Sequence, residues 1–336
     1  MDYKLHTFLG ICLCLGSAAY GQDAQLSQFY ASPVVQNPAF AGTAYRPRAF
    51  FQYRNQWPGT GQPIQTTVAS GDVYLPKAKS GLGLVMARNT AMGGVFQGTE
   101  VRGAYSFHQR ISKGLSAAYG IQLGFDQRNL GYSRLTFGDQ LDTTGRFRPS
   151  IDPTAADRSF TVPEIGVGGV LFTDKAYLSA TLRHVNQPTL SQEFGAPRLP
   201  MWFGLTGGYV WRFAQTRGLR DAYYLPELTL AFLYKRQAQW QQLDIGFYYN
   251  LQPLVLGVWY RGLPGFGKAQ GVFNHDAVTL LVGLKQDNLS IGYSYDVNLS
   301  GVVAAYAGSH EVSASYAFDP AGPKRRRARA LPCPSF

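Results

Sequence analysis

Apolar and polar residues alternate along several short stretches of this chain. Between Leu115 and Asp126 every second residue from Leu115 onward is apolar, and the residues between them are small or polar. The same period of two recurs over residues 243–251 and 289–297. Successive side chains of a β-strand point to opposite sides, so each stretch would have one apolar face and one polar face. The pattern therefore predicts β-strands.

The alternation, followed along the whole chain, predicts about fourteen strands. Their expected ranges are 48–55, 65–74, 81–89, 97–108, 114–127, 163–173, 176–185, 201–213, 227–235, 241–251, 254–262, 276–286, 288–297 and 309–318. Most are close to the ~9–11 residues that a tilted strand needs to cross a bilayer. We predict an all-β fold, a transmembrane antiparallel up-and-down β-barrel of outer-membrane type, over residues 47–318. A soluble β-sandwich would show the same alternation and is the alternative fold.

The connections between the expected strands differ in length at the two ends. Asp174-Lys175, Gln252-Pro253 and Asp287-Asn288 are short turns, whereas residues 128–162, 186–200 and 263–275 are long connections at the opposite end. Outer-membrane barrels have short periplasmic turns and long outer loops. Two connections depart from this asymmetry, because 214–226 is long at the inner end and 236–240 is short at the outer end. The asymmetry still favours the barrel over the sandwich.

The tryptophans and the last strand agree with this arrangement. Trp57, Trp202, Trp240 and Trp259 fall near outer strand ends and Trp211 near an inner end, as in an aromatic girdle. Ordinary core tryptophans are the simpler explanation. The last strand, from His310 to Phe318, would close the barrel against the first, and closure leaves no unpaired strand edge in lipid.

Composition argues against a charged cytosolic enzyme, and the lack of long apolar runs argues against a helical membrane protein. Charged residues make up 15% of the 336 residues, against roughly 25% in an ordinary soluble domain. Beyond Gly21 there is no run of 18 apolar residues, so no transmembrane helix is expected. The start is different: Lys4, the apolar run from Phe8 to Leu15, and Ala19-Tyr20-Gly21 predict a signal peptide over residues 1–21. The mature chain would keep only Cys333 and form no disulfide.

A search for catalytic and metal-binding motifs finds none. The histidines do not have the spacing of metal ligands, and no Cys/His zinc signature occurs. Gly81-Leu82-Gly83 and Gly166-Val167-Gly168-Gly169 lack the rest of a phosphate-binding motif, which favours glycines packed against a neighbouring strand. We therefore expect no enzymatic activity, no cofactor and no metal.

Residues 22–46 do not resemble a strand. Pro33, Asn37-Pro38 and Gly42 interrupt the segment, and Phe29 and Tyr30 are possible aromatic anchors. We expect a non-strand segment that either folds into the lumen as a plug or docks beneath the barrel on the periplasmic side. An ordered leader to the first strand without a function is the other interpretation.

Several ionisable residues occupy the alternate strand positions that are expected to face the lumen, which we call the inward phase. They are Glu100, Arg102, His108, Arg183, Asp244 and Asp296. Because the inside of a barrel is polar, a salt-bridged filling that fixes the barrel shape is the simplest interpretation. The alternative is a pathway or docking surface for a segment of a client protein.

The net charge of +11 is partly local. Lys324, Arg325, Arg326, Arg327 and Arg329 lie in a basic tail over residues 319–336. Export argues against a nucleic-acid partner, so we expect a solvated tail. A contact with an acidic periplasmic partner or anionic lipid is the alternative, which deletion of residues 320–336 would test.

Several motifs in order resemble the PorP/SprF family of type IX secretion outer-membrane proteins. They are Gln22-Asp23, Ser27-Gln28-Phe29-Tyr30, Asn37-Pro38-Ala39-Phe40-Ala41-Gly42, Tyr53-Arg54-Asn55-Gln56-Trp57-Pro58, His184-Val185-Asn186-Gln187-Pro188, Tyr260-Arg261-Gly262, Gly292-Tyr293-Ser294-Tyr295-Asp296, Leu299-Ser300 and Gly308-Ser309-His310-Glu311. The resemblance extends from about Gln22 to Phe318, and the tail from Pro320 departs from it.

The resemblance implies a non-enzymatic barrel that assists export or surface anchoring of a secreted adhesin-like protein, in some gliding bacteria. The partners that it implies are type IX secretion components, a periplasmic peptidoglycan-linked lipoprotein and the secreted surface protein. The barrel itself would lie in outer-membrane lipid. Candidate partner or lumen contacts are Asn37, Pro38, Tyr53, Arg54, Trp57, Glu100, Arg102, Arg183, Asp244 and Asp296. The alternative function is a passive outer-membrane transporter for a small solute, which needs a continuous path through the lumen.

Overall fold

The structure is a computed structural model of the chain. It describes residues 25–140, 149–152, 155–190, 198–213, 226–263, 275–299 and 308–319. The expected signal peptide, the first residues after it and the basic tail beyond Asp319 lie outside the described residues.

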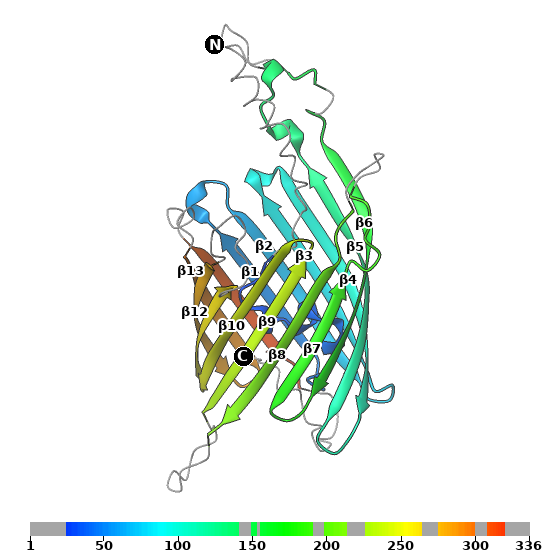
Figure 1. Cartoon of the computed structure of the whole chain (residues 1–336), viewed down its shortest axis with the longest axis vertical. Helices are drawn as coiled ribbons and strands as arrows, with labels where there is room; N and C mark the ends of the chain where they lie inside the picture. The colour runs from blue at the N-terminus through cyan, green and yellow to red at the C-terminus, as the bar shows by residue number, and fades with distance from the viewer. Residues whose placement is uncertain are drawn as a thin grey trace, which may run out of the picture.

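Fourteen antiparallel strands form one closed barrel in which each strand pairs with its neighbours in the chain and β1 pairs with β14 (Figure 1). The strands are β1 (Arg48–Gln56), β2 (Ile64–Leu75), β3 (Ser80–Ala91), β4 (Phe96–Arg110), β5 (Ser116–Leu130), β6 (Arg158–Phe172), β7 (Ala176–Arg183), β8 (Trp202–Arg212), β9 (Glu227–Gln237), β10 (Trp240–Leu251), β11 (Leu254–Gly262), β12 (His275–Gln286), β13 (Leu289–Asn298) and β14 (Ser309–Ala317). A single closed sheet confirms the predicted barrel and excludes the sandwich.

The two faces of the barrel wall differ as the alternation predicts. On β5 the outward side chains of Tyr119, Ile121, Leu123 and Phe125 are exposed, whereas Gln122 on the inward face is buried. Exposed leucines, isoleucines and aromatic residues continue around the outside of the other strands. This continuous apolar band is the lipid-facing surface of a membrane barrel.

The length of one hairpin differs from the prediction. β6 begins at Arg158 instead of residue 163, β5 continues to Leu130 instead of 127, and β7 already ends at Arg183. Outward residues of the added parts, such as Asn129 and Thr161, are polar. The hydrophobic alternation therefore ends where the lipid-facing band ends, although strand pairing continues beyond it.

The connections confirm the expected asymmetry. Residues 76–79, 173–175, 252–253 and 287–288 form short turns at one end, which we call the inner end. The connections between β5 and β6, and between β7 and β8, are long and lie at the outer end.

Trp211 is exposed on the outside, but Trp202 and Trp259 are buried. The girdle interpretation is therefore wrong for Trp202 and Trp259, because these side chains have the inward phase of their strands.

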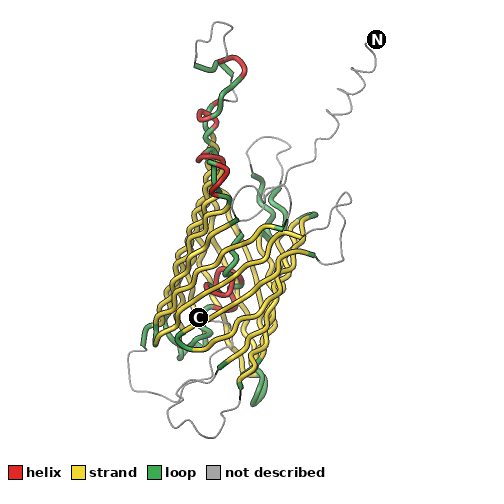
Figure 2. Tube along the Cα trace, turned by 90° about the vertical axis from the view of Figure 1, so that its left-hand side faces the viewer, coloured by secondary structure: helices red, strands yellow, loops and turns green. Residues whose placement is uncertain are grey.

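Over the described residues, helical structure is confined to short turns. These are η1 (Phe29–Ala31), α2 (Pro33–Gln36), η2 (Pro38–Phe40), η3 (Pro58–Thr60), η4 (Met92–Gly94), η5 (Tyr132–Arg134) and η6 (Gly138–Gln140). Among the described residues, no helix has the length and apolar character needed to cross a membrane. The first three turns belong to the N-terminal segment and lie inside the ring of strands (Figure 2).

A charge on the lipid-facing surface should destabilise the barrel. Leu123 is 57% exposed in the middle of the apolar band of β5. Leu123→Arg should lower the free energy of unfolding in lipid vesicles by about 2–4 kcal/mol, because arginine is costly near the bilayer midplane. Guanidinium titration of the vesicle-inserted protein measures this change. Leu135→Arg, in the outer loop and beyond the band, is the control and should change stability by about 0.5 kcal/mol or less. Equal effects of the two variants would contradict the assigned lipid-facing surface.

Candidate functional site in the barrel lumen

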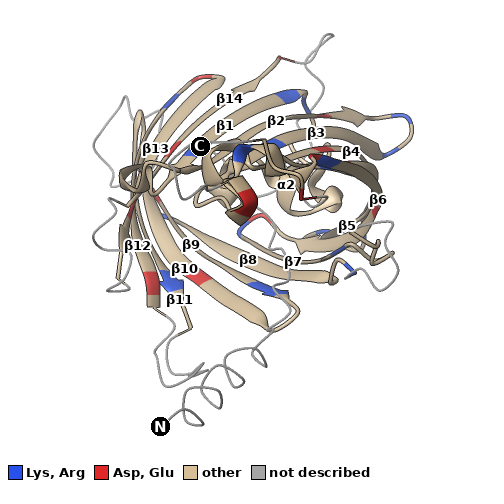
Figure 3. Cartoon of the chain, turned by 90° about the horizontal axis from the view of Figure 1, so that it is seen from above, with Lys and Arg blue, Asp and Glu red and all other residues tan. Residues whose placement is uncertain are grey.

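The N-terminal segment, residues 25–46, lies within the barrel and is called the plug (Figure 3). Most of its residues are buried, and Val34, Asn37, Ala39 and Ala41 have no exposed surface. At its start, Gln25 hydrogen bonds Gln242 near the outer end of β10. At its finish the chain enters β1 at the inner end. The plug therefore passes down the lumen from the outer half to the inner end.

The plug packs against the wall on several sides. Phe29, Tyr30 and Ala31 join an apolar cluster with side chains of β9–β12, among them Trp259 at 5.0 Å between ring centroids from Phe29. Leu26, Val34 and Ala41 pack against β2–β4. Ala39 and Phe40 pack against β5–β7. Contacts on three sides mean that the plug spans the width of the lumen.

Three glycines of the wall allow the plug to approach closely. A Cβ on Gly81 would lie 2.1 Å from the carbonyl oxygen of Ala41, one on Gly120 would lie 2.3 Å from the nitrogen of Ala39, and one on Gly168 would lie 2.1 Å from Oδ1 of Asn37. Such distances exclude any side chain unless the plug moves. Gly81 and Gly168 were expected to pack against neighbouring strands. Instead, they accommodate the plug.

Asn37 connects the plug to two adjacent strands. Its side-chain nitrogen donates to the carbonyl oxygen of Gly169 in β6 at 3.2 Å and to that of Ala180 in β7 at 3.0 Å. Its Oδ1 accepts the N–H of Ala39 at 2.8 Å, which caps η2. Pro38 follows at the first position of η2, where the missing N–H has no cost. Asn37 therefore fixes the local turn and docks it on the wall.

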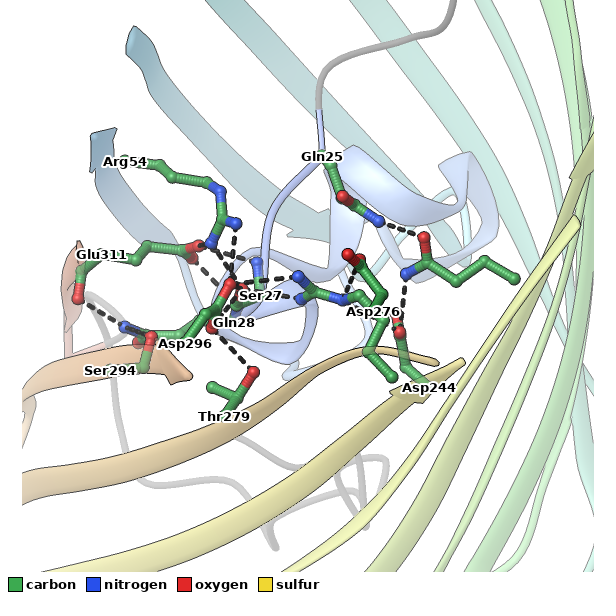
Figure 4. Close-up of polar contacts among 12 residues, drawn as sticks. Gln25, Ser27, Gln28, Arg54, Asp244, Asp276, Thr279, Ser294, Asp296 and Glu311 are labelled. Carbon is green, nitrogen blue, oxygen red and sulfur yellow. Dashed lines mark hydrogen bonds and ion pairs between the residues drawn. The ribbon is translucent and has the colours of Figure 1, made fainter. Parts of the chain in front are cut away.

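The start of the plug is held by charged side chains at the outer half of the lumen (Figure 4). The hydroxyl of Ser27 donates to Oδ2 of Asp296 at 2.8 Å and accepts hydrogen bonds from Arg54 and Arg261. Arg54 also forms an ion pair with Asp296 at 2.7 Å. The hydroxyl is thus surrounded by paired charges from β1, β11 and β13.

Glu311 of β14 binds the plug backbone directly. Its carboxylate accepts the N–H of Ser27 at 2.7 Å and the N–H of Gln28 at 2.9 Å, and it pairs with Arg54 at 3.3 Å. The side chain of Gln28 donates to Ser294 and accepts from Ser313. Glu311 and Gln28 are both fully buried. A buried ion requires partners. The carboxylate of Glu311 therefore depends on the N–H groups of the plug as well as on Arg54.

The same network continues along the wall. Arg261 pairs with Asp296 at 3.0 Å and with Asp244 at 3.2 Å, and Lys235 pairs with Asp244 at 3.2 Å. Opposite charges alternate along this series of contacts, which runs from Glu311 through Arg54, Asp296, Arg261 and Asp244 to Lys235. This arrangement is the salt-bridged filling expected from the sequence, and its centre is a plug residue.

A second network lies on the opposite strands. Arg183 pairs with Glu164 at 2.9 Å and with Glu100 at 3.2 Å. Arg102 lies 3.6 Å from Glu100 and 3.9 Å from Glu164. The guanidinium of Arg183 also lies over the ring of Trp202. These charges join β4, β6 and β7 below the long outer connections.

The end of the plug is anchored at the inner end of the barrel. Arg48 forms an ion pair with Asp72 at 2.8 Å, and Oδ2 of Asp72 also accepts the N–H of Gly42 at 2.6 Å. The carbonyl oxygen of Ala41 accepts from Ser106 at 2.7 Å and lies 2.9 Å from Nε2 of His108. Both ends of the plug are thus bound to the wall by charged or polar side chains.

The structure brings most of the candidate residues together, in two groups. Asn37, Pro38, Arg54, Asp244 and Asp296 belong to the plug and its network, and Glu100, Arg102 and Arg183 form the second network. Tyr53 has the outward phase of β1, so it lies away from the lumen. Trp57 follows β1 in a left-handed conformation with φ of 54° and lies at the outer rim.

Sequence reasoning did not select several residues of the site as lumen contacts, although Glu311, Arg261 and Ser27 lie in the motifs that resemble the family. Glu311, Arg261 and Glu164 share the inward phase of their strands with the residues that it did select. Their phase was therefore a usable signal. The glycines and Ser27 gave no such signal, because their role depends on what lies opposite them. Within the described ranges, no group of three or more metal-ligating side chains occurs.

The described parts of the outer connection between β5 and β6 contain specific hydrogen bonds. Asp139 accepts the N–H of Ile151 at 2.7 Å and the hydroxyl of Ser150, and these hydrogen bonds lower the pKa of Asp139 below its ordinary value. Asp157 accepts the N–H of Ser133, which lowers its pKa likewise. The described parts of this connection stand above the rest of the barrel (Figure 1).

A closed barrel with an apolar outer surface and an occupied lumen defines a plugged, membrane-spanning β-barrel. The sequence matches the model of the type IX secretion system membrane protein PorP/SprF over residues 18–316. The chain belongs to the PorP/SprF family and is an outer-membrane barrel.

The structure is similar to that of a Pseudomonas aeruginosa FadL homologue, with 13% identity, a TM-score of 0.46, and coverage of 86% of this chain and 94% of the other. It is also similar to the KdgM porin, with 12% identity, a TM-score of 0.36, and coverage of 81% and 99%. A search of curated proteins found no match.

Proposed function

We propose that this chain is a non-enzymatic barrel of the type IX secretion pathway that assists export or surface anchoring of a secreted adhesin-like protein. The observation that carries the proposal is the family membership of a barrel whose lumen holds its own N-terminal segment. Its partners would be other secretion components and a peptidoglycan-linked lipoprotein at the inner end. The secreted protein would meet the long outer connections, and no nucleic-acid partner is proposed.

The plug argues against the alternative of passive solute transport. A transporter needs a continuous path, whereas the plug contacts β2–β4, β5–β7 and β9–β12 and is bound to β1, β13 and β14. Its main-chain N–H groups donate to two buried, ion-paired carboxylates, Glu311 at the outer half and Asp72 at the inner end. Displacing it would remove these main-chain hydrogen bonds to buried charged groups, each of which contributes about 1.5–3 kcal/mol. These contacts favour an accessory role for the barrel.

Deleting the gene should remove one large exported protein from the cell surface. The comparison is made between surface and culture-fluid proteins of the parent, the deletion strain and a complemented strain. The expected result is loss of that protein from the surface, with other outer-membrane proteins unchanged. An unchanged profile, in a strain that also lacks paralogous genes, would contradict the proposal. Uptake of small solutes should be the same in the parent and the deletion strain.

A further inference from the structure

β6 is longer than the strand beside it. β6 covers Arg158–Phe172, but its pairing with β7 covers only Val167–Phe172. On its other side β6 pairs with β5 along its whole length. Among the described strands, β6 and β7 share the shortest pairing in the barrel. The outer part of β6 therefore has a partner on one side only, and Figure 1 shows β6 rising above β7.

The pairing is ended by Asn186, a residue of the His184–Pro188 motif. The N–H of Val185 donates to the carbonyl oxygen of Ile165 at 3.0 Å. The side chain of Asn186 then accepts the N–H of Ile165 at 3.3 Å and donates to the carbonyl oxygen of Pro163 at 2.7 Å. An amide side chain thus takes the place of the next strand residue. It satisfies the edge of β6 as far as Pro163 and no further.

Past Pro163, Thr161 and Ser159 have main-chain groups that point to the uncovered side of β6. Backbone groups of alternate residues point to the same side of a strand. Because those of Ile165 and Pro163 point toward β7, the N–H and C=O groups of Thr161 and Ser159 point the same way. In the part of the chain that the structure describes, no strand pairs with them there. We call Ser159–Thr161 the open edge.

The open edge lies in water on the outer side of the membrane. Phe125 is exposed on the outside of β5 and lies opposite Pro163, and Ile165 and Val167 are exposed next to it. Beyond this level the outward residues Thr161, Ser159 and Gln127 are polar. The lipid-facing band therefore ends at Pro163. A partner at the open edge must come from outside the cell.

We propose that the open edge of β6 binds an extended segment of the exported protein by strand addition. The alternation of N–H and C=O groups fits a polypeptide in the β conformation, and an exposed edge is a template for such pairing. This inference rests on the proposed function and names the surface on which the client is held. Pro163, which has no N–H, limits the register so that the added strand stays above the lipid.

A second copy of the barrel fits the open edge poorly. Directly below it, β7 and β8 continue the wall within the membrane, with exposed Leu178 and Tyr209 facing lipid. A second barrel embedded at the same level would meet this wall before it reached β6. A single extended segment can enter from above, over the ends of β7 and β8. The geometry thus favours a flexible segment over a folded membrane neighbour.

The test removes the main-chain N–H of Thr161 by substitution and includes a matched control variant. Thr161→Pro removes the N–H that points to the uncovered side of β6. The native Pro163, two residues away in the same strand, shows that this strand accepts proline. Thr161→Val keeps the N–H and changes only the side chain. The protein that disappears from the surface of the deletion strain is measured in both variants. Insertion of each barrel is checked by heat-dependent gel mobility.

Thr161→Pro should lower the surface amount of that protein by about fivefold or more, the loss expected when a main-chain hydrogen bond and its register are removed. Thr161→Val should match the parent. If deletion of the gene removes the client but Thr161→Pro retains it normally, the open edge is not its binding site, although the proposed function stands. A photo-crosslinker at Ser159 should join the same client. Crosslinking to a second barrel instead would overturn the inference.

Discussion

Replacing Glu311 by alanine should release the start of the plug and open the lumen to ions. The buried carboxylate of Glu311 accepts two main-chain N–H groups of the plug and pairs with Arg54. Its loss leaves both donors and part of a buried guanidinium without an acceptor. Removing one partner of a buried ion pair costs about 3–5 kcal/mol, which would raise the open population by about two to three orders of magnitude.

Single-barrel conductance in planar bilayers measures this effect. The parent should stay closed for most of the recording, whereas Glu311→Ala should show frequent openings. Glu227→Ala is the control, because the ion pair of Glu227 with Arg212 has 32% and 43% exposed side chains. An exposed pair contributes about 0–1 kcal/mol, so this variant should behave like the parent. Closed recordings for Glu311→Ala would mean that the carboxylate does not hold the plug.

The second large effect is expected for Gly168→Ala. The added Cβ would lie 2.1 Å from Oδ1 of Asn37, which must then leave its position. Asn37 would lose its hydrogen bonds to Gly169 and Ala180, each worth about 1 kcal/mol. Overpacking adds about 1–3 kcal/mol. Together these losses should undock the middle of the plug.

Cleavage by chymotrypsin checks this prediction, because Phe29, Tyr30 and Phe40 of the plug are buried in the parent. Gly168→Ala should be cut within the plug much faster than the parent protein. Gly169→Ala is a control at the next residue, since its Cβ would lie 3.9 Å from the nearest atom, the carbonyl oxygen of Ala118. Equal cleavage of the two variants would show that the contact between Gly168 and Asn37 does not hold the plug.

The barrel could be predicted because its strands have two different surroundings. Leu123 and Gln122 alternate in the sequence since one faces lipid and the other faces the lumen. The outer part of β6 escaped prediction for the same reason. Both faces of Ser159 and Thr161 are in or near water, so no hydrophobic period marks the strand there.

The site could be predicted in part. The inward phase identified Asp244 and Asp296 as lumen residues, and both are paired there. Arg54 was a candidate through its motif, and it pairs with Asp296. The phase does not tell which charges meet, because this depends on the barrel register and on Ser27 between them. The short turns of the plug have no period at all. Its place in the lumen follows from contacts between segments more than 200 residues apart, such as Ser27 with Glu311.

The groups that hold the start of the plug come from the two ends of the barrel sheet. Arg54 belongs to the first strand and Glu311 to the last, and these strands meet only when the ring closes. A sheet that lacks its last strand has no carboxylate for the main chain of Ser27 and Gln28. Secure seating of the plug is therefore possible only in a fully assembled ring. An unfinished barrel would therefore differ from the finished one by lacking a docked plug.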